Sequence, residues 1–168
     1  MATWELVPRQ GIRTIGVDLV LGMDRAAARA ALGGETGGET GGETGGETGR
    51  ETGRETGAGL AGPVSHFPGE DDYTDADTWI RLHYDDGTLH AIELLRGDLR
   101  LDGIALLGGA YRPALEEALA AKGFRFESAA AYGEGRECAS LGVNIATHED
   151  AGGDGDGVEW VIVSSDIE

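Results

Sequence analysis

The sequence is poor in cysteine and has no long apolar segment. Cys138 is the only cysteine, so an internal disulfide is impossible and a reducing compartment is expected. No apolar run approaches the roughly 20 residues that a membrane-spanning helix needs. The basic-then-apolar order of a signal peptide is missing from residues 1–5. These absences predict a cytoplasmic protein that does not associate with membranes.

Positive charge is scarce as well. Lysine and arginine together number 13 against 31 aspartates and glutamates, which gives a formal net charge of -18. Such a surface repels nucleic acid and anionic lipid and speeds encounter with cationic proteins. Solubility, adaptation to salt or a coding bias, which Lys122 as the only lysine suggests, would also explain the acidity. We expect a protein partner with a basic surface, no nucleic acid and no membrane, and the oligomeric state stays open.

Motifs for catalysis and for metal binding are also lacking. The sequence has no phosphate-binding loop, dinucleotide glycine pattern, zinc-ligand spacing or nucleophile elbow. Cys138 and His148 could form a nucleophile and base, but Cys138 falls in an apolar segment and is expected to be buried and inert. Residues 154–157 resemble a calcium loop, yet Ser165 stands where its last carboxylate is required. We expect no catalytic residue, no cofactor, no metal and no enzyme.

Two segments are predicted to be loops. Residues 33–56 repeat Gly-Gly-Glu-Thr four times and Gly-Arg-Glu-Thr twice, with no apolar residue. Nothing there offsets the entropy of ordering, so a disordered insertion is expected over 33–57. Residues 58–78 are rich in glycine, proline and acidic side chains, including Asp71 and Asp72. We expect a solvated loop there, with a short strand near Tyr73.

A strand, a glycine turn and a short helix are predicted over 17–33. Asp24 suits the helix N-cap and Gly33 the left-handed position that ends a helix. One or two strands are expected before it, over 1–21. A similar order recurs after a connecting segment, with a strand near 103–107 and a helix over 112–122. Further strands are expected over 124–128, 137–147 and 158–165.

Residues 79–95 predict a β-hairpin around Asp85-Asp86-Gly87. The expected register pairs Tyr84 with Thr88, Leu82 with His90 and Ile80 with Ile92. The inner face then carries Ile80, Leu82, Tyr84, His90, Ile92 and Leu94, and the outer face carries Trp79, Arg81, His83, Leu89, Ala91 and Glu93. An exposed tryptophan beside charged side chains is typical of a binding hot spot. We therefore assign Trp79, Arg81, His83 and Glu93 to partner binding.

The pattern predicts an α+β fold built of two similar units. Residues 1–96 form the first unit, with the insertion inside it, and residues 97–168 form the second. Each unit is a short helix with an antiparallel β-meander. The helices are expected to pack on one face of the sheet and to leave the other face partly open.

The segment Leu21-Gly22-Met23-Asp24, followed by Ala28 and by Leu32-Gly33, resembles a known signature. It opens the small lipoproteins of outer-membrane barrel assembly and proteins like the β-lactamase inhibitor protein. The resemblance covers residues 12–33, and the hairpin 79–95 in pattern. It implies a tandem of two units, each a helix pair on a short meander, whose open sheet face binds another protein.

These observations favour a non-enzymatic, acidic protein-binding module. An immunity or inhibitor protein that occludes a cationic partner, such as a toxin acting on nucleic acid, is the function we expect. The alternative is a small-molecule-binding protein or enzyme that uses a cleft between helices and sheet.

Overall fold

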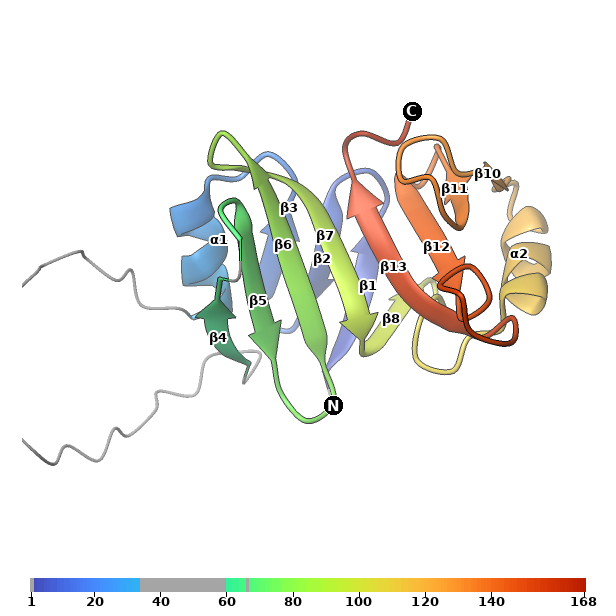
Figure 1. Ribbon diagram of the computed structural model, residues 1–168, viewed down its shortest axis with the longest axis horizontal. Coiled ribbons are helices and arrows are strands. Elements are labelled where there is room, and N and C mark those ends of the chain that lie inside the picture. The colour runs from blue at the N-terminus through green and yellow to red at the C-terminus, as the bar shows by residue number, and fades with distance from the viewer. Residues whose placement is uncertain (1, 34–59, 66) are drawn as a thin grey trace, which may run out of the picture.

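The computed structural model describes residues 2–33, 60–65 and 67–168, which form two facing β-sheets and two short helices (Figure 1). The predicted α+β class is therefore confirmed. The five-stranded sheet has the order β3-β2-β1-β8-β9: β1 (Thr3–Val7), β2 (Gly11–Thr14), β3 (Val17–Val20), β8 (Asp98–Leu101) and β9 (Ile104–Ala105). The helices are α1 (Arg25–Leu32) and α2 (Arg112–Ala120). Apart from Gly33, the predicted disordered insertion 33–57 lies outside the described residues.

The eight-stranded sheet has the order β10-β11-β12-β13-β7-β6-β5-β4. Its strands are β4 (Ala61–Val64), β5 (Glu70–Thr74), β6 (Trp79–Asp85), β7 (Thr88–Arg96), β10 (Glu127–Ser128), β11 (Arg136–Cys138), β12 (Val143–Thr147) and β13 (Val158–Ser164). All its strand pairs in the described residues are antiparallel. The last strands of the two predicted units, β7 and β13, meet at its centre.

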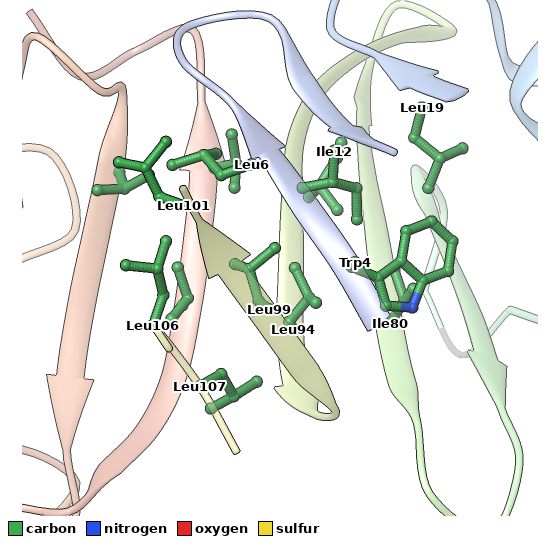
Figure 2. Close-up of a cluster of buried hydrophobic side chains, with 14 of the residues drawn as sticks. Trp4, Leu6, Ile12, Leu19, Ile80, Leu94, Leu99, Leu101, Leu106 and Leu107 are labelled. Atoms are coloured by element: carbon green, nitrogen blue, oxygen red, sulfur yellow. The ribbon is translucent and has the colours of Figure 1, made fainter. Parts of the chain in front are cut away.

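The hydrophobic core lies between the two sheets (Figure 2). Alternate residues of the small sheet, such as Trp4 and Leu6, are buried there together with Ile80 and Leu94 of the large sheet. We expected helices on this face, but the small sheet lies on it and α1 and α2 flank that sheet at opposite ends (Figure 1). The short hairpins of the small sheet have an apolar face of their own, and burial against the large sheet removes both faces from water.

The N-terminal segment forms three strands, although one or two were expected. Two tight turns, at 8–10 and 15–16, separate them. At Gly11, where φ is 141°, a Cβ would lie 2.0 Å from the carbonyl oxygen of Leu19. The expected connection 97–102 contains β8, which pairs in parallel with β1. β8 was not predicted because it spans only four residues and directly follows Gly97.

α1 ends as predicted, whereas α2, predicted over 112–122, ends at Ala120. Asp24 accepts a hydrogen bond from the backbone N–H of Ala27 at 2.7 Å, and Gly33 closes α1 with a left-handed φ of 82°. Pro113 lies in the first turn of α2, and Gly123, with φ 91°, donates to the carbonyl of Ala120. Local capping chemistry therefore decides where α1 begins and ends, whereas α2 begins after Tyr111 without a side-chain cap.

The hairpin β6–β7 exists, but its predicted register is wrong. The observed pairs are Tyr84 with Leu89, Leu82 with Ile92 and Ile80 with Leu94. Asp86 and Gly87 both have positive φ, so they form a two-residue loop where a longer one was expected. An irregularity next to His83 then lets Leu89 and Ile92 both face the core, so Leu89 is buried and His90 is partly exposed. The inward placement of Ile80, Leu82, Tyr84, Ile92 and Leu94 is confirmed.

Three other segments differ from expectation. The strand predicted over 124–128 is confined to β10 (Glu127–Ser128). The strand predicted over 137–147 is divided into β11 and β12 by a turn that ends at Gly142. The loop predicted over 58–78 contains β4 and β5. β5 includes Tyr73, as expected there, but it also places Asp71 and Asp72 in the sheet.

The two halves of the chain share a contact pattern at the start of each helix. In the first half, Asp24 forms a bridge with Thr88, Arg25 N donates to Gly87 O at 2.9 Å, and Leu89 N donates to Met23 O at 2.8 Å. In the second half, Tyr111 forms a bridge with Gly157, Arg112 N donates to Asp156 O at 3.0 Å, and Val158 N donates to Ala110 O at 3.0 Å. Each helix start is thus tied in the same way to the last strand of its half.

Deletion of the tetrad repeat is expected to leave the fold intact. The connection from helix to last strand runs over 33–87 in the first half and only over 121–157 in the second, yet both make the same terminal contacts. Joining Leu32 to Gly57 is expected to change the free energy of unfolding by less than about 1 kcal/mol, because loop-closure entropy depends weakly on length. Chemical denaturation of the shortened chain measures this. Loss of cooperative unfolding would show that the repeat is needed for folding.

Candidate functional site

The outer face of the eight-stranded sheet, which points away from the small sheet, carries rows of cross-strand neighbours. The central row runs through Asp72, Arg81, Glu93, Ile162, Asn144 and Glu137. A parallel row runs through Glu70, His83, Ala91 and Ser164. Successive residues of a strand point to opposite faces, and Ile80 and Leu82 point into the core. Arg81, which lies between them along β6, therefore points outward.

Arg81 is the centre of a charged network on this face. Its guanidinium donates to Asp72, with Nε–Oδ1 at 2.8 Å and Nη2–Oδ2 at 3.2 Å, and Nη1 lies 3.7 Å from Glu93 Oε2. The hydrogen bond with Asp72 raises the pKa of Arg81 above its usual value. The guanidinium also lies 5.8 Å from the ring centroid of Trp79. A bidentate pair that also contacts an aromatic ring holds Arg81 in one orientation.

His83 lies between two carboxylates. Its Nε2 is 3.0 Å from Glu93 Oε2, and its Nδ1 is 3.6 Å from Glu70 Oε1. His83 and Glu93 are diagonal neighbours across β6 and β7, so they meet without being directly opposite. We define the charged patch as Glu70, Asp72, Trp79, Arg81, His83 and Glu93.

The structure therefore brings the four predicted partner-binding residues together. One expectation about them is wrong, since Trp79 is half-buried rather than exposed. It lies opposite Thr74 on β5, and its indole is near both Arg81 and Asp72. Sequence reasoning missed Glu70 and Asp72, because their segment had the composition of a loop.

The second half of the outer face is covered by a loop of the chain itself. The carboxylate of Glu137 accepts hydrogen bonds from three successive backbone N–H groups, those of Ala130, Ala131 and Tyr132, at 3.0, 2.9 and 3.3 Å. Asn144 Nδ2 donates to the carbonyl of Glu134 at 2.8 Å. We call residues 129–135 the covering loop. Burial raises the pKa of Tyr132 within it.

A second charged cluster lies under α1. Asp71, predicted to be in a solvated loop, is fully buried and receives bidentate hydrogen bonds from Arg25 and Arg29 at 2.6 to 3.0 Å. Burial by itself would raise the pKa of Asp71, but the hydrogen bonds from the two arginines outweigh it and lower the pKa. Burial also raises the pKa of Tyr73 and of Tyr84. The cluster fixes α1 to the sheet. The only sequence signal for it is the four-residue spacing of the two arginines.

The corresponding contact of the second half has inverted charges. Glu116 occupies the turn of α2 that Arg29 occupies in α1, and its Oε1 lies 3.1 Å from Nε of Arg136 on β11. Asp71 pairs across the sheet with Leu82, and Arg136 pairs with Ile145. In one half the helix supplies the cation, and in the other it supplies the anion.

The predicted chemical candidates do not converge. Cys138 is buried on β11, and His148, next to the β12–β13 connection, pairs with Glu159. Over residues 2–33, 60–65 and 67–168, no group of three or more His, Cys, Asp or Glu side chains could hold a metal ion.

A cavity of about 430 Å³ lies where the connections at 76–77, 107–109 and 148 meet. No helix in the described part of the chain is long and apolar enough to span a membrane.

No protein-family model, curated protein or solved structure matches this chain. The functional argument therefore depends on the geometry of the site.

Proposed function

We propose that this protein is a non-enzymatic binding module that contacts a basic protein partner through the charged patch. The observation that carries the proposal is the contiguity of Trp79, Arg81, His83 and Glu93 on one outer sheet face. Three carboxylates in the patch, from Glu70, Asp72 and Glu93, face one arginine, so the patch favours a cationic surface.

The network also supports binding by a preorganised surface. Hydrogen bonds and the aromatic contact restrict Arg81 and His83 before any partner arrives, so fewer rotamers are lost on association. The net charge of -18 adds long-range attraction for a basic partner. An immunity or inhibitor protein that occludes a cationic partner in the cytoplasm fits these properties.

We further propose that the chain is a tandem of two similar units, 1–96 and 97–168, as the resemblance to the β-lactamase inhibitor protein implies. The matched contacts at the two helix starts support it. The positions in the sequence support it as well, because β8, β9 and α2 begin the same number of residues after β2, β3 and α1, respectively. Among the strands of the described residues, β1 is then the one without a counterpart. Its position between β2 and β8 joins the two units.

Trp79→Ala is expected to weaken partner binding by about 2 kcal/mol or more, because a large aromatic anchor is removed from the patch. The partner is first identified by pull-down from the native host, and binding kinetics are then measured at two ionic strengths. Higher salt should slow association more than it speeds dissociation, as electrostatic steering requires.

The matched control is Ile15→Ala. Ile15 is 93% exposed and lies on the turn between β2 and β3 of the other sheet. It should leave both affinity and stability unchanged. Unchanged affinity in Trp79→Ala, or a partner with an acidic surface, would remove the proposal in favour of the small-molecule alternative.

A further inference from the structure

The two halves of the outer face correspond position by position, but they differ in cover. Asp72 lies beside Arg81 as Glu137 lies beside Asn144, and Glu93 and Ile162 meet between these pairs. In the second half the covering loop leaves Asn144 at 0% and Glu137 at 9% exposure. The covering loop shows that this kind of sheet face accepts a loop segment, which donates backbone N–H groups to an outward carboxylate.

The first half is more accessible. The side chains of Arg81, His83 and Glu70 are 25%, 25% and 27% exposed, and that of Glu93 is 14% exposed. The connection from Val64 to Glu70 is shorter than the one from Ser128 to Arg136, which holds the covering loop. The charged patch is thus the counterpart of a covered face, with the side chains of Glu70, Arg81 and His83 within reach of solvent and that of Asp72 buried.

The patch also holds three carboxylates, from Glu70, Asp72 and Glu93, and one guanidinium, from Arg81. Glu70 and Glu93 lie on opposite sides of the His83 imidazole, at 3.6 and 3.0 Å from its two nitrogens. Arg81 is shared between Asp72 and Glu93, and its contact with Glu70 is long, at 4.0 Å. A second cation near Glu70 and Glu93 would reduce the repulsion between these carboxylates.

We infer that a loop of a basic partner protein occupies the charged patch, in the way that the covering loop occupies the second half, and that its main contact is an arginine side chain held by Glu70 and Glu93. The inference rests on the proposed function and names the chemistry that the patch recognises. Arginine suits it better than lysine, because its planar guanidinium bridges two carboxylates and stacks on an aromatic ring. Arg81 already makes such a contact with Trp79.

The test uses the full chain labelled with ¹⁵N and two probes, N-acetyl-L-arginine methylamide and N-acetyl-L-lysine methylamide. The protein has three tryptophans, Trp4, Trp79 and Trp160, so indole N–H signals report three different places. We expect a saturable shift centred on Trp79, with the arginine probe binding about threefold or more tightly than the lysine probe. Trp4, which is fully buried, should not respond.

A charge-matched pair of variants separates the patch from the general negative field. Glu70→Gln with Glu93→Gln should weaken the arginine probe about tenfold. Glu117→Gln with Asp154→Asn removes the same charge at exposed positions on α2 and on the β12–β13 connection, and should have no effect. Equal weakening by both pairs, equal binding of the two probes, or a shift at the buried Trp4 as large as that at Trp79 would overturn the inference. The comparison of probes on the unaltered chain decides the matter even where a variant does not fold.

The inference and the proposed function fail in different ways. If the arginine probe does not bind but Trp79→Ala still weakens the partner, the arginine site is wrong and the binding function stands. If the probe binds as expected but the partner is insensitive to Trp79→Ala, the arginine site stands and the proposed partner interface is wrong.

Discussion

Replacing Trp4 by alanine is expected to lower the free energy of unfolding by about 3–5 kcal/mol, the range for deleting a buried large aromatic side chain. Trp4 is fully buried on β1, in the cluster between the two sheets (Figure 2). β1 lies between β2 and β8, so a cavity there affects strands from both proposed units. Urea denaturation followed by circular dichroism measures the change.

Two further variants distinguish lost packing from lost hydrogen bonding. The indole Nε1 of Trp4 is buried without a hydrogen-bond partner in the described structure. Trp4→Phe removes this donor and keeps a large ring, so it should cost less than about 1.5 kcal/mol. Ile15→Ala, at an exposed position, should change stability by less than about 0.5 kcal/mol. A Trp4→Ala protein as stable as the unaltered chain would show that the sheets do not pack on Trp4.

Removal of the Asp71 charge is the second change with a large expected effect. Asp71→Asn should destabilise the protein by about 3 kcal/mol, the low end for breaking a buried ion pair. The low end applies because Arg25 and Arg29 retain 29% and 28% side-chain exposure and can be partly hydrated. Asp71→Arg should be worse, since three guanidinium groups would then share one site. Asp18→Asn, at an exposed position on β3, is the control.

The inverted contact of the second half suggests a rescue. Adding Arg29→Glu to Asp71→Arg reproduces the charge arrangement of Glu116 and Arg136. The double variant should regain at least about half of the stability lost in Asp71→Arg, and a double variant no more stable than the single one would contradict this. The inverted charges also disfavour a mispaired fold in which each helix packs on the other half. In such a fold Arg29 would meet Arg136 and Glu116 would meet Asp71, and these like charges would repel each other.

The Asp71 contribution should depend on pH in a defined direction. The pKa of Asp71 is lowered in the folded protein, so its stabilisation is complete above the unfolded pKa of about 3.9 and is lost as the pH falls through the lower folded pKa. The difference between the unaltered chain and Asp71→Asn should therefore be constant above about pH 5 and should shrink below about pH 4. A difference that grows on acidification would contradict the ion-pair assignment.

Much of the candidate site could be predicted from the sequence, because its predicted members share one hairpin. Trp79, Arg81 and His83 alternate along β6, and Glu93 lies on the neighbouring strand, so period-two alternation places them on one face. The register error did not separate them, because the irregularity near His83 shifts pairing without reversing the face of Glu93. The half-burial of Trp79 depends on β5, which composition had not predicted as a full strand.

The sequence by itself determined both ends of α1, the existence of the β6–β7 hairpin and its apolar inner face. Asp24, Gly33 and the Asp86-Gly87 turn act through bonds to residues a few positions away, and such bonds form wherever the local sequence allows them. Only the tertiary structure decided that Asp71 is buried, since the arginines that compensate its charge lie 42 and 46 residues away in the sequence. It also decided that a second sheet lies on the inner face and that the covering loop lies on only half of the outer face. Composition cannot specify such long-range pairings, because each is stable only once both partners have folded against each other.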